Sequence, residues 1–205
     1  MTATSGAAVP TTVSSFQHSA LIAPAVSLSP GPVVTYSPLA EGAQGTWQTL
    51  NAMRACVLGQ VPPDYSGYQD EFNISAAGTI CANAPGQEAK AQIAALFNWV
   101  TQNITYEPHP FNQQVCQDAK RTIDLRRGDC VSLSVLLATL LACLGYRSQF
   151  VAQFVDGEDA SHVYVEVFLP NGETLALDAV AKDQPIGWRQ KTLDGGFETE
   201  WPIFT

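Results

Sequence analysis

The chain has 205 residues, which is long enough for one domain with a substantial hydrophobic core. Its formal net charge of −9 argues against binding to the phosphate backbone of nucleic acids or to an acidic membrane surface. No apolar run is long enough to predict a transmembrane helix. Because no Lys or Arg precedes Arg54, the basic region of a signal peptide is missing, and we expect a cytoplasmic protein by default.

The cysteine pattern predicts free thiols. The five residues are Cys56, Cys81, Cys116, Cys130 and Cys143, an odd number without a C-x-x-C pair or a spacing typical of zinc sites. No metal and no other cofactor is therefore expected, and a disulfide framework is not expected in a reducing compartment. A Cys56–Cys81 bridge is the alternative if the protein resides outside the cell.

Residues 1–45 are expected to form an extended arm rich in Ser, Thr, Ala, Val and Pro. Its prolines prevent a long helix, and Glu41 is its only formally charged side chain. Apolar side chains recur along the arm, so we expect it to lie on the surface of a partner protein. A flexible linker and an arm packed on its own domain are the alternatives.

Residues 46–86 are predicted to hold one helix followed by a loop. From Thr46 to Val57 the apolar residues recur with helical spacing, with Thr46 as the expected N-cap and Gly59 as the expected stop. Residues 62–85 carry Gly, Pro, Asn and Asp at short intervals, which indicates an irregular loop with at most a short turn.

A second helix is expected over residues 87–103. Its apolar stripe consists of Ile93, Leu96, Phe97, Val100 and Ile104. His109 follows between two prolines, where a solvated loop residue is expected rather than a catalytic one.

The stretch from Arg126 to Tyr146 predicts a central helix whose first turn carries Cys130. Asp129 is the expected N-cap and Gly145 the expected stop. Leucines occupy most sides of the helix, which indicates burial. The amide groups at a helix start lack helical acceptors and carry partial positive charge, so they stabilise a thiolate there. By itself, a cysteine in such a helix is more often a packing residue, as we expect for Cys143.

After Gly145 the hydrophobic pattern alternates, which predicts strands over residues 149–155, 162–168 and 174–178. Asn171-Gly172 indicates a hairpin turn between the last two strands, because both residues tolerate positive φ. Asp156-Gly157 is expected to turn the chain between the first two strands. Helices followed by an antiparallel meander give an α+β fold.

Three reactive side chains are expected at one end of this meander. His162 opens the second strand and Asp178 closes the third, so they are near neighbours across adjacent strands. If the Cys130 helix packs with its N-terminus over that end, the imidazole can take the thiol proton and the carboxylate can orient the imidazole. Taken singly, His162 and Glu166 could be solvent-facing strand residues and Asp178 a turn cap.

Four segments resemble the transglutaminase-like superfamily of papain-like cysteine hydrolases and acyl transferases. They are FNWVTQNITY (97–106), RGDC with the apolar helix that follows it (127–146), HVYVEV (162–167) and LDAV (177–180). The resemblance implies a papain-like core over residues 87–181, with Cys130 as the nucleophile, His162 as the general base and Asp178 as its orienting residue. Tyr164 stands where the family often has Trp. The tail, residues 182–205, shows no such resemblance, and Trp188, Phe197 and Trp201 are expected to pack on the core or to form a contact surface.

The resemblance implies a cysteine hydrolase, peptidase-like or amidase-like, that acts on a peptide or protein amide through a thioester acyl-enzyme. Acyl transfer to an amine shares the first half-reaction and is an alternative. A third hypothesis is a structural or assembly protein, for example in a virus or phage particle, that reuses the domain and binds a partner through its arm. The nearly uncharged arm and a charged fraction of only 14% motivate this hypothesis.

Overall fold

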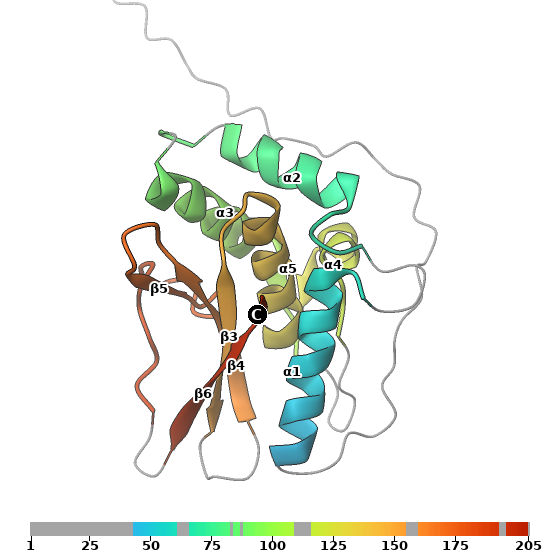
Figure 1. Ribbon diagram of the computed structural model, residues 1–205, viewed down its shortest axis with the longest axis vertical. Helices are drawn as coiled ribbons and strands as arrows, with labels where there is room; N and C mark the ends of the chain where they lie inside the picture. The colour runs from blue at the N-terminus through green and yellow to red at the C-terminus, as the bar shows by residue number, and fades with distance from the viewer. Residues whose placement is uncertain are drawn as a thin grey trace, which may run out of the picture.

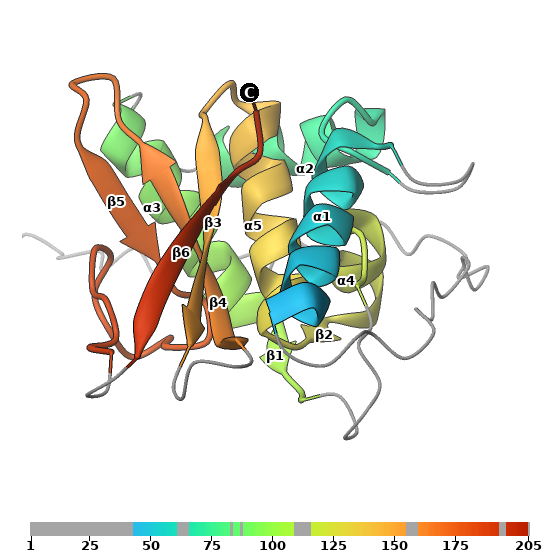
Figure 2. The same ribbon diagram turned by 60° about the horizontal axis from the view of Figure 1, so that its bottom comes forward.

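The fold is organised around a buried helix, α5 (Cys130–Cys143), which lies between a group of helices and an antiparallel sheet (Figures 1 and 2). Every residue from Val131 to Ala142 is buried. The computed structural model describes residues 43–60, 66–82, 84–86, 88–108, 116–154, 160–192 and 196–204. Within these ranges no helix is long and apolar enough to cross a membrane.

Four further helices and two short strands cover one side of α5. The helices are α1 (Ala43–Leu58), α2 (Glu71–Ala82), α3 (Ala89–Asn103) and α4 (Ala119–Leu125). The strands β1 (Thr105–Tyr106) and β2 (Arg127–Gly128) pair in parallel beside the N-terminus of α5 (Figure 2).

The other side of α5 faces a four-stranded sheet in the order β5-β4-β3-β6, with every neighbouring pair antiparallel. Its strands are β3 (Ser148–Phe154), β4 (Ala160–Phe168), β5 (Thr174–Leu177) and β6 (Phe197–Pro202). The predicted α+β class and the meander of the first three strands are confirmed. The described part of the predicted strand over residues 149–155 lies in β3, and Val155 and the Asp156-Gly157 turn lie outside the described residues.

Both predicted ends of α5 are confirmed by their hydrogen bonds. The Asp129 side chain accepts from the Ser132 amide at 2.8 Å, which satisfies one of the free amides of the first turn. Gly145 has a φ of 83°, and the amide of Tyr146 donates to the Leu141 carbonyl at 3.0 Å. A glycine in this left-handed conformation closes the helix and turns the chain into β3.

The helical half differs from the prediction in three places. First, α1 begins at Ala43, so Thr46 is a helix residue and not the N-cap; its hydroxyl accepts from the Ala160 amide at 3.2 Å. Second, the predicted loop over 62–85 contains α2, which starts after Asp70, whose side chain accepts from the Phe72 amide at 2.9 Å. Third, α4 lies between the last two predicted helices, in a segment for which no helix was predicted; the Asp118 side chain caps it by accepting from the Arg121 amide at 2.7 Å. Residues 1–42 of the predicted arm and His109 lie outside the described residues.

In the hairpin between β4 and β5, the predicted positive φ is observed at Gly172 but not at Asn171. Gly172 has a φ of 87°, whereas Asn171 has a negative φ and instead accepts the Glu173 amide at 3.1 Å. The asparagine thus contributes a side-chain acceptor and the glycine contributes the left-handed backbone.

The tail after Lys182 adds the edge strand β6, which pairs with β3 along its whole length. Trp201 packs against the core, and its ring lies 4.9 Å from that of Trp47. Phe197 is largely exposed but stacks on Phe154 with ring centres 4.3 Å apart. The tail therefore packs on the core, as expected, through β6 and Trp201.

The sheet face opposite α5 is buried although it is partly polar. Glu166, for which a solvent-facing position was the simple alternative, is 2% exposed. Its carboxylate accepts from Gln149 at 2.7 Å and forms an ion pair with Arg189, which belongs to the tail. A buried carboxylate is tolerable only with such partners, so the tail completes the fold on this face.

Arg189→Met is expected to lower the free energy of unfolding by about 1–3 kcal/mol, because it leaves the Glu166 carboxylate with too few partners. Urea unfolding measures this. Arg147→Met is the matched control, since Arg147 makes one long contact to the Phe204 carbonyl at the exposed surface and should change little. Equal losses for the two variants would contradict this account of Glu166.

Candidate functional site

Cys130 lies at the first position of α5, where the turn after β2 delivers it. Its side chain is partly exposed, whereas the helix residues from Val131 to Ala142 are buried. The amide of Cys130 has no helical carbonyl to bind, because the first amides of a helix precede the first helical acceptor. The Cys130 sulfur and an amide that no carbonyl of the helix accepts from therefore lie at the same end of α5.

Gly128 sets how closely β2 approaches α5. A Cβ atom at this position would lie 2.7 Å from the Cβ of Ser132 and 3.5 Å from a methyl carbon of Thr122. Real Cβ contacts are longer, and the Ser132 Cβ belongs to the buried first turn of α5. The glycine two positions before Cys130 is therefore needed for packing.

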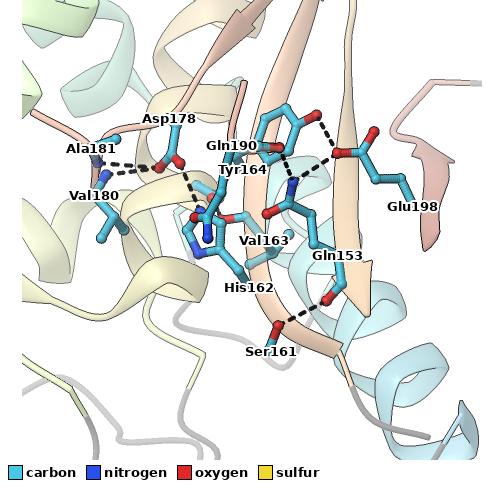
Figure 3. A network of polar contacts seen from close by, with 11 residues as sticks. Gln153, Ser161, His162, Val163, Tyr164, Asp178, Val180, Ala181, Gln190 and Glu198 are labelled. Carbon is cyan, nitrogen blue, oxygen red and sulfur yellow. Dashed lines mark hydrogen bonds and ion pairs between the residues drawn. The ribbon is translucent and has the colours of Figure 1, made fainter. Parts of the chain in front are cut away.

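His162 and Asp178 are joined by a hydrogen bond of 2.8 Å between Nε2 and Oδ2 (Figure 3). In the register of β4 and β5, Val165 is opposite Leu177, so Asp178 follows the last paired residue and reaches His162 diagonally. The side chains of His162 and Asp178 are 15% and 5% exposed. The predicted proximity of the two residues is thus observed.

The second oxygen of Asp178 is held by the backbone. Its Oδ1 accepts from the amides of Val180 at 3.0 Å and Ala181 at 3.4 Å, as the dashed lines in Figure 3 indicate. With both oxygens engaged, the carboxylate has one orientation, and the Nε2 of His162 is the nitrogen that carries the proton. The Nδ1 of His162 is then the acceptor that is free to face another group.

Cys130 is the second residue that acts on the His162 ring. Burial of the ring lowers the pKa of His162, but hydrogen bonds to Asp178 and Cys130, and the charges of both, outweigh burial and raise the pKa from 6.5 to about 9. Two potential anions near one imidazole favour the imidazolium form. The structure therefore brings together all three residues that the sequence singled out.

Tyr106 is a neighbour of Cys130 that the sequence prediction did not include. It lies on β1, in register with Gly128 of β2, and it is 45% exposed. Burial of its hydroxyl raises its pKa, and the charges of Cys130 and Asp129 raise it further. Tyr106 ends the FNWVTQNITY segment, but nothing local in the sequence indicates that this segment pairs with the turn before Cys130.

Tyr164 and two polar residues support the sheet beside His162. The ring of Tyr164 is stacked at 6.3 Å from the His162 ring, and its hydroxyl donates to Glu198 of β6 at 3.3 Å. Burial and the Glu198 charge raise the pKa of Tyr164 to about 12. Gln153 donates to the same carboxylate at 2.7 Å and to the Gln190 carbonyl at 3.1 Å (Figure 3). The tail thus reaches the neighbourhood of the site.

The other cysteines differ from Cys130 in their surroundings. Burial raises the pKa of Cys81 and raises that of Cys143 to about 11. A hydrogen bond to Cys56, together with burial, raises the pKa of Cys116 well above its ordinary value. Cys143 is only partly buried, and its sulfur donates to the Tyr68 carbonyl at 3.1 Å. In the described residues, no group of three or more His, Cys, Asp or Glu side chains could hold a metal ion.

Comparison with known sequences identifies the family. The sequence profile of the transglutaminase-like superfamily matches residues 75–179, a span that contains Cys130, His162 and Asp178. The chain belongs to the transglutaminase-like superfamily. No curated protein sequence gave a significant match.

Two solved structures resemble this transglutaminase-like chain. A candidate protease from Parabacteroides distasonis is 13% identical with a TM-score of 0.50, over 73% of this chain and 36% of that chain. A candidate cysteine protease from Cytophaga hutchinsonii is 18% identical with a TM-score of 0.47, over 64% of this chain and 42% of that chain. The similarity to the Parabacteroides distasonis protein supports a shared fold, although the sequence identity is low. The chain therefore corresponds to less than half the length of either protein.

Gly128→Ala is expected to displace the first turn of α5 and to destabilise the protein by about 1–3 kcal/mol, as overpacking does. Thermal unfolding and the rate of Cys130 alkylation measure the two effects. Gly78→Ala is the matched control, because a Cβ at Gly78 of α2 meets nothing within 4 Å and alanine favours a helix. A Gly128→Ala protein as stable and as reactive as the parent would contradict the packing role.

Proposed function

We propose that this transglutaminase-like chain is a cysteine hydrolase, peptidase-like or amidase-like, in which Cys130 is the nucleophile, His162 the general base and Asp178 the residue that orients it. The observation that carries the proposal is the arrangement around one imidazole. Nε2 is fixed to Asp178 at 2.8 Å, and Cys130 lies near enough to the same ring to raise its pKa. A purely structural use of the domain does not require this arrangement.

In the proposed reaction, the Cys130 thiol gives its proton to Nδ1 of His162, and the thiolate attacks the carbonyl carbon of an amide. A C–S bond forms and the carbonyl oxygen becomes an oxyanion, for which the Cys130 amide at the start of α5 is a suitable donor. The imidazolium then protonates the leaving amine as the C–N bond breaks, which leaves a thioester on Cys130. Asp178 keeps the ring in one orientation throughout.

Water resolves the thioester in the second half-reaction. His162 takes a proton from the water, the hydroxide attacks the thioester carbon, and the carboxylic acid leaves as the thiolate is restored. A primary amine in place of water would yield a new amide. We propose hydrolysis of a peptide or protein amide as the main reaction, in line with the two candidate proteases of similar structure.

Selective alkylation tests whether Cys130 is activated. At neutral pH, iodoacetamide is expected to modify Cys130 at least about tenfold faster than the other thiols, because theirs are buried or have raised pKa values. His162→Ala should remove this advantage. Cys143, which is also partly exposed, is the internal control. Reactivity of Cys130 no higher than that of Cys143 would sink the enzyme proposal.

Turnover tests the proposed chemistry directly. Incubation with p-nitrophenyl acetate is expected to place one acetyl group on Cys130, detected by mass mapping, and Cys130→Ala should abolish it. Asp178→Asn is expected to slow turnover of a peptide substrate by about 10²–10⁴-fold without unfolding the protein, as loss of an orienting carboxylate does. When a primary amine is added, an amide product in place of the acid would favour acyl transfer over hydrolysis.

The pH profile of kcat/KM should show an alkaline limb near pH 9, because the His162 imidazolium that protonates the leaving amine loses its proton there. Asp178 raises this pKa, so Asp178→Asn is expected to move the limb to lower pH. Glu198→Gln is the control, since Glu198 is hydrogen-bonded to Tyr164 and Gln153 rather than to His162. An unmoved limb in Asp178→Asn would contradict the assigned role of Asp178.

A further inference from the structure

Two thiols outside the site face one another across the helical layer. The sulfur atoms of Cys56, on α1, and Cys116, just before α4, lie 3.3 Å apart. The two residues are sixty positions apart in the sequence and are 0% and 3% exposed. Neither is part of the proposed reaction.

The sulfur of Cys56 contacts that of Cys116, whereas two other cysteines have different partners. Cys81, which the sequence left open as a partner for Cys56, instead directs its sulfur to the Gln92 carbonyl at 3.7 Å. Cys143 directs its sulfur to the Tyr68 carbonyl. The fold therefore places the thiol of Cys116 against that of Cys56, whereas the Cys81 thiol has a different partner.

We propose that Cys56 and Cys116 form a disulfide when the protein meets a small-molecule disulfide such as oxidised glutathione. The thiolate of one cysteine attacks the glutathione disulfide and releases one glutathione thiol, which leaves a mixed disulfide on the protein. The other cysteine attacks the protein sulfur of that mixed disulfide and releases the second glutathione. Two electrons and two protons pass from the protein thiols to the glutathione, and one S–S bond is formed.

The sulfur atoms need only a small approach to make this bond. A disulfide has an S–S length of about 2.05 Å, so the sulfurs move together by roughly 1.3 Å from their hydrogen-bonded separation. The hydrogen bond between the two sulfurs, together with burial, raises the pKa of Cys116 and favours its thiol form in the folded protein. Glutathione therefore reaches the pair during folding or through local opening, and the closed fold then protects the bond.

The bond joins two parts of the chain that support the proposed site. On α1, the Thr46 hydroxyl accepts from the Ala160 amide, two residues before His162. Beyond Cys116, Asp118 caps α4, which leads through β2 to Cys130. A Cys56–Cys116 disulfide would therefore link α1, which contacts the start of β4, covalently to the segment that leads through α4 and β2 to Cys130.

The experiment compares the full-length protein refolded in a glutathione redox buffer with the same protein refolded in excess reductant. The oxidised protein is expected to lose two hydrogens in mass and to yield a linked pair of tryptic peptides, residues 55–90 and 91–120. Its Tm should exceed that of the reduced protein by roughly 5–15 °C, because the bond closes a long loop in the unfolded chain.

Two variants assign the bond, since Cys56 and Cys81 lie on the same tryptic peptide. Cys81→Ala should keep the linked peptides and the difference in Tm, whereas Cys56→Ala should lose both. If Cys56→Ala does not fold, the peptide map of the wild type and Cys81→Ala decides by itself. Recovery of unlinked peptides, or a link that Cys81→Ala removes, would overturn the proposal whether or not Cys130 proves to be catalytic.

Discussion

The burial of α5 on every side is the constraint on which the rest of the structure depends. A helix covered by leucine all round must lie between two layers, so helices are required on one side and a sheet on the other. If α5 rotated about its axis or slid along it, apolar side chains would become exposed to water. The position of Cys130 relative to β4 is therefore set by core packing, which holds a side chain more firmly than a loop would.

Backbone groups orient the polar residues around that helix end. The Asp129 side chain caps α5, and Asp178 uses one oxygen for two backbone amides and the other for His162. Each carboxylate is satisfied by neighbours that cannot move independently of the fold. The basic character of His162 follows from this arrangement, because the fixed carboxylate counteracts the effect of burial.

The sequence predicted the α5 helix, the meander and the grouping of Cys130, His162 and Asp178 because these features lie in strongly patterned segments. It did not predict α2, in which the Nδ2 of the buried Asn73 donates to the carbonyls of Ser66 and Gly67. It also missed the seven-residue α4, whose Asp118 cap also binds the Ser66 amide. Tyr106 enters the site through the parallel pairing of two short strands. Contacts between distant segments decide these features, and local periodicity does not report them.

The positions of α1 and β6 have a consequence for where an independently folding unit can begin and end. Both lie outside residues 75–179, the span matched by the family, yet Met53 and Val57 of α1 are fully buried and β6 pairs with all but the first residue of β3. A fragment cut at the limits of the match would expose one side of α5 and leave β3 as a bare edge strand, which invites aggregation. The family match therefore contains the candidate site residues, while the packing of the core extends from α1 to β6.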